Sequence, residues 1–143
     1  MNGKKSADEI RGFEYDWIAC DVDGFVGLFS TAGGGYAPPE FLLDTHAHDA
    51  AIDAILELPV STEARFAPKV LPNLQNTWQL VAERGFFAFD SDPHGGPYRQ
   101  VAAPRAPIHV DQLPQSVRTV ARALTLKRVR FDIHSIVSAD LLR

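Results

Sequence analysis

Apolar and polar positions alternate most clearly near the start of the chain, where they predict a hairpin. Residues 15–22 and 25–31 are both rich in aromatic and β-branched side chains, which favour strands. The Asp23-Gly24 pair between them predicts a type I′ turn, in which both central residues have a positive φ. We therefore expect two antiparallel strands, with Asp21 facing solvent and Gly27 allowing another backbone to approach closely.

Helical spacing of apolar residues follows a glycine-rich loop. Residues 40–58 predict a first helix, because two prolines precede it and a third ends it. A second helix is predicted to run from residue 74 or 75 to 84, with Asn73 as its cap and Gly85 ending it. Residues 113–124 predict a third helix, since their apolar positions fall on one helical face.

Further extended segments are predicted in the second half of the chain. Residues 86–90 and 98–102 flank a turn rich in glycine and proline and predict a second hairpin. Residues 126–134 alternate apolar and polar side chains and predict a final strand. The resulting order, β-β-α-α-β-β-α-β, predicts the α+β class: a mainly antiparallel sheet built from hairpins, with about three helices packed on one face.

Length and composition indicate one globular domain. A chain of 143 residues fits the usual domain size, so we expect a flexible lead-in at residues 1–12 and a single α+β domain over residues 13–143. The single cysteine, Cys20, cannot form an internal disulfide, and its place among aromatic residues predicts a buried, inert thiol. We expect a cytoplasmic protein without a membrane span, because the sequence shows neither the apolar core of a signal peptide nor an apolar run of about 20 residues.

Charge is unevenly distributed along the chain. Residues 1–63 carry twelve acidic and three basic side chains, whereas residues 64–143 carry six acidic and eleven basic ones. The net charge of −4 argues against non-specific binding of nucleic acid. The basic run at residues 127–130 could still contact RNA, but it lacks the aromatic pairs of an RNA-binding sheet and is more typical of a solvated face.

Asp21-Val22-Asp23-Gly24, directly after an apolar run, resembles the opening motif of haloacid-dehalogenase-like phosphatases. In that family one Asp is the nucleophile, the second is the general acid and base, and Mg²⁺ lies between them. This chain departs from the family at Phe25, where Thr or Val is expected, and it lacks a convincing late acidic pair for the metal. Turn chemistry alone accounts for Asp21 and Asp23.

Asp44, His46 and His48 have spacings found in metal sites. On the predicted helix, however, the two histidines point about 200° apart and cannot share a metal ion. Asp44 and His48 could share one, yet no second His or Glu pair supports them. We therefore expect no metal, and we expect His48 to be a hydrogen-bonded histidine at the boundary of the core.

Two glycine-rich loops leave an alternative open. Gly33-Gly34-Gly35 precedes a helix and could cradle a phosphate, although the Lys-Ser/Thr of a P-loop is missing. His94 lies in the second loop, and His109 and His134 could meet it in space. The alternative is a small enzyme or ligand-binding protein that uses these loops with His94 or with the aspartates of the first turn.

Residues 16–33, with the sequence DWIACDVDGFVGLFSTAG, resemble the opening of small bacterial proteins found among polymorphic-toxin immunity proteins and their relatives. The shared pattern is Trp, an apolar strand, an Asp-x-Asp/Glu-Gly turn, a second apolar strand ending in Thr-Ala-Gly, and Pro before a helix. The resemblance covers about 20 of the 143 residues. It implies a non-enzymatic protein that binds and blocks a cognate toxin, and it specifies no binding residues.

The first predicted helix carries acidic side chains that suit such a partner. Asp44, Asp49, Asp53 and Glu57 would present a negative surface to a basic target such as a nuclease. Complementary charge of this kind also raises association rates. We therefore predict a protein-binding module without a cofactor, whose partner is another protein and, most concretely, a toxin domain.

Overall fold

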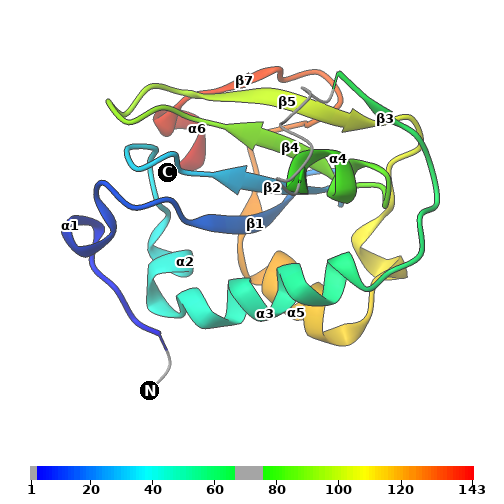
Figure 1. Ribbon diagram of the computed structural model, residues 1–143, viewed down its shortest axis with the longest axis horizontal. Coiled ribbons are helices and arrows are strands. Elements are labelled where there is room, and N and C mark those ends of the chain that lie inside the picture. The colour runs from blue at the N-terminus through cyan, green and yellow to red at the C-terminus, as the bar shows by residue number, and fades with distance from the viewer. Residues whose placement is uncertain (1–2, 67–75) are drawn as a thin grey trace.

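The computed structural model describes residues 3–66 and 76–143 and consists of one sheet surrounded by helices (Figure 1). The helices are α1 (Ala7–Ile10), α2 (Pro39–Leu43), α3 (Thr45–Leu56), α4 (Thr77–Ala82), α5 (Gln115–Ala123) and α6 (Ala139–Leu142), with a 3-10 turn η1 at Val110–Gln112. The strands are β1 (Asp16–Asp21), β2 (Val26–Ser30), β3 (Ala64–Arg65), β4 (Phe87–Asp90), β5 (Tyr98–Pro104), β6 (Thr125–Leu126) and β7 (Ile136–Val137).

The strands form one mixed sheet in the order β3-β5-β4-β2-β1-β6, and β7 also pairs with β5. The hairpins β1–β2 and β4–β5 are antiparallel as predicted, and the α+β class is confirmed. The prediction of a mainly antiparallel sheet holds only in part: most pairs are antiparallel, but the sheet is mixed, because β2 pairs with β4 and β1 pairs with β6 in parallel. The strands of each parallel pair are far apart in the chain, since only a long connection can return the chain in the same direction.

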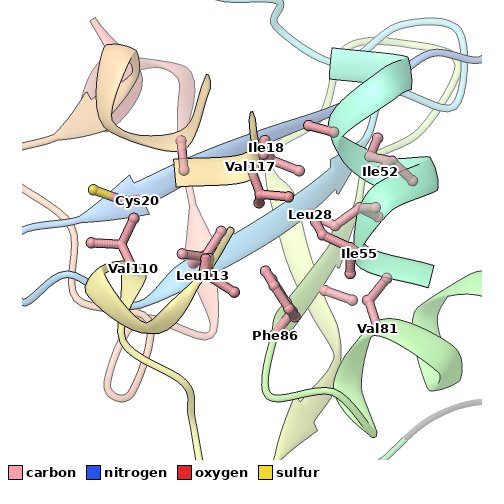
Figure 2. Close-up of a cluster of buried hydrophobic side chains, with 14 of the residues drawn as sticks. Ile18, Cys20, Leu28, Ile52, Ile55, Val81, Phe86, Val110, Leu113 and Val117 are labelled. Atoms are coloured by element: carbon pink, nitrogen blue, oxygen red, sulfur yellow. The ribbon is translucent and has the colours of Figure 1, made fainter. Parts of the chain in front are cut away.

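The longer helices cover one face of the sheet. α3 and α5 lie side by side against β1, and α4 lies against β4 and β5 (Figure 1). Figure 2 shows the core that they enclose, in which side chains of β1 and β2 meet those of the three helices. Its buried members include Ile18, Leu28, Ile52, Ile55, Val81, Phe86 and Val117. The prediction that the helices pack on one face is therefore right for these three helices. The described residues contain six α-helices, however, and not about three as predicted.

An aromatic layer covers the opposite face of the sheet. Trp17, Phe29 and Phe89 are partners across β1, β2 and β4, and their rings stack with centroids 4.2 and 4.7 Å apart. Phe131, from the C-terminal segment, packs on this row with its centroid 5.8 Å from that of Phe29. A Cβ at Gly27 would lie 3.1 Å from the Phe131 ring, so Gly27 admits a side chain instead of the predicted backbone.

The turn between β1 and β2 differs from the predicted type I′ turn. Gly24 has a positive φ of 87°, whereas Asp23 does not have a positive φ. The Gly24 amide donates to the Asp21 carbonyl at 3.1 Å, so Val22 and Asp23 form the centre of the turn and Gly24 follows as a bulge. The prediction that Asp21 faces solvent is wrong, because Asp21 is only 1% exposed.

The helix predicted over residues 40–58 is two helices. α2 and α3 are separated by Asp44, whose φ of −156° and ψ of 83° lie outside the helical region. The Asp44 carboxylate accepts a 3.2 Å hydrogen bond from the amide of Ala47 and so caps α3. The apolar spacing alone could not reveal the break, because an aspartate is tolerated inside a helix and also favoured as its cap.

The helices predicted in the second half of the chain are present. α4 is capped by Asn76, whereas Asn73, the predicted cap, lies outside the described residues. Gly85 follows α4 with a φ of 96°, the conformation expected of a glycine that ends a helix. Residues 3–66 and 76–143 contain no helix with the length and apolar content needed to cross a membrane.

The strand predicted over residues 126–134 is not formed. Thr125–Leu126 pairs with β1 as β6, and the chain then continues in turns until β7. Val129 and Phe131 are buried as the alternation indicated, but Ile133 is 62% exposed. The alternation arises because this segment inserts side chains into the aromatic layer without pairing as a strand.

Residues 3–12, which we expected to form a flexible lead-in, make specific contacts with the rest of the chain. Ile10 of α1 is buried, and the amide of Gly12 donates to the carbonyl of Gly33 at 2.8 Å. The carbonyl of Gly3 accepts from the amide of Thr45 at 3.1 Å. This segment therefore connects the glycine-rich loop after β2 with the start of α3.

Candidate functional site

Acidic side chains line the exposed side of α3. Asp49, Asp53 and Glu57 are exposed and follow one another at four-residue spacing, so they lie on one helical face; we call these three residues the acidic face. None of them forms an ion pair with a basic residue in the described part of the chain. Asp44, the fourth predicted residue, is the cap of α3 and stands apart from this face.

A polar row continues from the acidic face to the end of the sheet. Asp16, Ser30 and Asp90 are direct partners on β1, β2 and β4. Their side chains share the helix-covered side of the sheet, because alternate residues of the same strands lie in the core beneath the helices. From α4, the indole Nε1 of Trp78 donates to the Ser30 hydroxyl at 3.1 Å. We call Asp16, Ser30 and Asp90 the polar row.

The carboxylates of this region repel one another. Burial is the main cause that raises the pKa of Asp16, whereas a hydrogen bond from Ser30 lowers it. Three nearby carboxylates raise it further, those of Glu14, Asp49 and Asp90. Burial also raises the pKa of Asp49 and Asp90. Oδ1 of Asp16 is buried and has no hydrogen-bond partner among the described residues. The acidic face and the polar row are therefore one electrostatically connected, negative region.

The aspartates of the first turn are held by backbone groups and by an arginine. Oδ1 of Asp21 accepts from the amides of Asp23 and Phe25 at 3.0 and 2.9 Å. Oδ2 of Asp21 accepts from the amide of Phe131 at 2.8 Å. Asp23 pairs with Nε of Arg130 at 2.9 Å. Because both oxygens of Asp21 are engaged in this way, the arrangement is that of a structural carboxylate and not that of a phosphatase nucleophile.

His48 forms a hydrogen bond, as the sequence predicts, but it is buried instead of lying at the boundary of the core. It is 4% exposed, and its Nδ1 accepts from the amide of Ile18 on β1 at 3.0 Å. Burial lowers the pKa of His48 to about 4, although Asp44 acts in the opposite direction. His46 is exposed on another side of α3. Within residues 3–66 and 76–143, no three His, Cys, Asp or Glu side chains are grouped as metal ligands would be.

The two glycine-rich loops do come together in space. With α1 they line a cavity of about 350 Å³, and His94 is part of its wall. The amides of residues 33–35 already donate to Thr31, and those of residues 94–96 donate to Asp92. These loops therefore lack the set of free N–H groups that a phosphate cradle requires.

The residues of the alternative site lie far apart along the sheet. The loop of residues 33–35 follows the end of β2, whereas Asp21 and Asp23 precede its start. His94 lies beside the loop of residues 33–35, at the end of β2. His109 lies beside Gly24, at the start of β2. The fold therefore separates His94 from the aspartates of the first turn by the length of β2.

Cys20 is buried, as predicted. Burial raises the pKa of its thiol, and its Sγ lies 3.5 Å from the hydroxyl of Thr125. A catalytic thiol would instead need a histidine or another base in contact with it. The position and environment of Cys20 are those of a packing residue.

Sequence reasoning missed the polar row. Its members come from strands that pair only in the folded sheet, and the parallel pairing of β2 with β4 leaves no local signal. The sequence offered one weak indication of this row: Asp16 and Asp90 are carboxylates at the terminus of an apolar strand. Such a residue is also common where a strand simply reaches the surface, so the sequence could not distinguish a functional carboxylate from an ordinary surface one.

Comparison with models of protein families, with curated proteins and with solved structures gave no match to this chain. The resemblance of residues 16–33 to immunity-type proteins therefore stays a prediction.

Proposed function

We propose that this protein is a non-enzymatic binding module that recognises a basic partner protein through the acidic face of α3. In its most concrete form, the partner is a toxin domain and this chain is its immunity-type inhibitor. The observation that carries the proposal is the row of three exposed carboxylates, none of which forms an ion pair with a basic side chain among the described residues.

The acidic face is unfavourable for the isolated molecule. Like charges four positions apart on a helix destabilise it by about 0.2–0.5 kcal/mol per pair. The neighbouring helix α5 does not relieve this repulsion through Arg122, because Arg122 pairs with Asp111. A basic partner offsets the repulsion when it binds, and long-range attraction guides it to this side of the molecule.

The polar row behind the acidic face supports the same interpretation. The raised pKa values of Asp16 and Asp90 mean that their surroundings disfavour the ionised carboxylates. Positive charge brought near them reduces that cost. A cationic surface of a partner therefore gains from the half-buried carboxylates as well as from the exposed ones.

The proposal is tested by capturing partners from the native host with a tagged protein in three versions. The wild type is compared with D49N/D53N/E57Q, which neutralises the acidic face. The control D8N/E63Q/D132N removes the same number of exposed carboxylates from other surfaces, so that net charge changes equally.

We expect the wild type and the control to capture one stoichiometric partner that the α3 variant loses. Capture of that partner by all three versions would place binding away from α3. A wild-type protein that captures no stoichiometric partner would overturn the binding-module proposal, whatever the variants do.

The alternative of a small enzyme or ligand-binding protein has less support. His94 and the aspartates of the first turn lie at opposite ends of β2, and the amides of the glycine-rich loops are engaged within those loops.

A further inference from the structure

A side chain provides part of the hydrogen bonding along the outer edge of β1, the edge that faces away from β2. At one end of this edge, the amide of Cys20 donates to the carbonyl of Leu124 at 3.1 Å, just before β6. The outward amide two residues earlier, that of Ile18, donates instead to Nδ1 of His48 at 3.0 Å. His48 therefore occupies the place that a backbone carbonyl would hold in a neighbouring strand.

This hydrogen bond requires a neutral imidazole. Nδ1 can accept the Ile18 N–H only while it carries no proton, so the ring hydrogen is on Nε2. Protonation would set two N–H groups against each other. It would also place a positive charge in a buried site, where the imidazole meets the ring of Phe41 edge-on with centroids 5.0 Å apart.

His48 lies within a corner of the fold that has its own bonds. The carbonyl of Gly3 accepts from the amide and the hydroxyl of Thr45 at 3.1 and 2.8 Å, and the amide of Lys5 donates to the carbonyl of Leu42 at 2.9 Å. The irregular backbone at Asp44 separates α2 from α3 within it. We call residues 3–5 and 39–49 the α2–α3 corner.

We propose that His48 is an acid-sensitive latch. While neutral, it holds the α2–α3 corner on the open edge of β1; once protonated, it releases the Ile18 amide and the corner opens while the centre of the sheet stays folded. The latch does not depend on any partner. Its consequence for binding, that acid loosens the start of the helix bearing the acidic face, rests on the proposed function.

Other titratable groups lie on the elements that pack around His48. Asp44 acts directly on the imidazole and favours its protonation. The remaining groups are Asp16, Cys20 and Asp21 on β1, Glu40 on α2, His46, Asp49 and Asp53 on α3, Arg118 and Arg122 on α5, and Lys4 and Lys5 beside α2. Since burial raises the pKa of Asp16 and Asp49, the test must separate their protonation from that of His48.

Amide hydrogen exchange of the whole protein at pH 7 and pH 5 tests the latch. With a pKa of about 4 in the closed corner and 6.5 in the open one, the open population rises about twentyfold between these pH values. We expect the protection factor of the Ile18 amide to fall by about that factor, together with those of the α2–α3 corner. Amides of β2 and β4 keep their protection.

Two variants assign the effect to His48. H48N keeps an acceptor oxygen near the position of Nδ1 and does not titrate, so it should abolish the pH dependence at Ile18. H46N removes the neighbouring exposed histidine as a control and should leave that dependence intact. If H48N does not fold, imidazole nitrogen resonances of the wild type replace it, and the ring should stay neutral with its hydrogen on Nε2 at pH 5. Ile18 protection that does not change with pH, an equal fall in H48N, or a His48 ring that is charged at pH 5 while the Ile18 amide keeps its protection would overturn the latch.

Discussion

The backbone N–H of Phe131 donates a 2.8 Å hydrogen bond to Oδ2 of Asp21, which lies 110 positions earlier in the chain. Oδ1 of the same carboxylate closes the turn between β1 and β2. One buried side chain therefore fixes the first hairpin and the C-terminal segment together. Beside it, Asp23 and Arg130 join the same two segments by an ion pair at the surface.

Removal of the Asp21 carboxylate should be strongly destabilising. D21A leaves three backbone N–H groups without their acceptor, and each such group costs about 1–3 kcal/mol when it stays buried. We expect the free energy of unfolding, measured with urea, to fall by about 3 kcal/mol or more. D23A is the control, because it removes a half-exposed ion pair and should cost less than about 1 kcal/mol. Equal losses in the two variants would show that the Asp21 carboxylate has no special role.

The contact between Gly27 and Phe131 should appear as a coupling between two substitutions. G27A places a Cβ 3.1 Å from the Phe131 ring, and overpacking of this kind costs about 1–3 kcal/mol. In an F131A background the ring is absent, and the same alanine should be neutral or stabilising by up to about 1 kcal/mol, since glycine weakens a strand. Urea unfolding of the four proteins in this double-mutant cycle measures the coupling. A coupling of zero would contradict the close approach.

Ionisation of Asp16 should lower stability. Burial, and then three neighbouring carboxylates, raise its folded-state pKa above the unfolded value of 3.8, so the folded protein binds this proton more tightly than the unfolded chain does. The stability that neutral Asp16 contributes is present below pH 3.8 and is lost as pH rises through the folded-state pKa.

We therefore expect D16N to raise the free energy of unfolding at pH 7, with the gain disappearing as pH falls below 3.8. D53N, at an exposed position of the acidic face, is the matched control and should show a smaller change. A D16N protein that is less stable than the wild type at both pH values would indicate that the carboxylate of Asp16 is a structural hydrogen-bonding group.

Local signals made part of this fold predictable. The strands β1, β2, β4 and β5 and the helix α5 followed from alternation, turn residues and helical spacing, each within a short stretch of chain. The parallel pairs β2–β4 and β1–β6 could not be predicted in this way, because they join segments that are far apart in sequence. The alternation over residues 126–134 was misleading. This segment buries Val129 and Phe131 and leaves the residues next to them exposed, which gives the same apolar–polar pattern as a strand.

The candidate site was predictable to a similar extent. Helical spacing alone puts Asp49, Asp53 and Glu57 on one face, and that much was visible in the sequence. The role of Asp44 as a cap depends on a break between two helices that the apolar pattern does not show. The polar row depends on the parallel pairing of β2 with β4, so the sequence alone could not predict that its carboxylates lie in one row.

The most direct test of the proposed binding surface is the affinity of the captured, purified partner for the three versions of this protein, measured by calorimetry at about 50 and 200 mM salt. We predict that D49N/D53N/E57Q weakens binding roughly tenfold or more at low salt and removes most of the salt dependence, while D8N/E63Q/D132N stays close to the wild type. Equal affinities and equal salt dependence for all three versions would contradict recognition through the acidic face of α3.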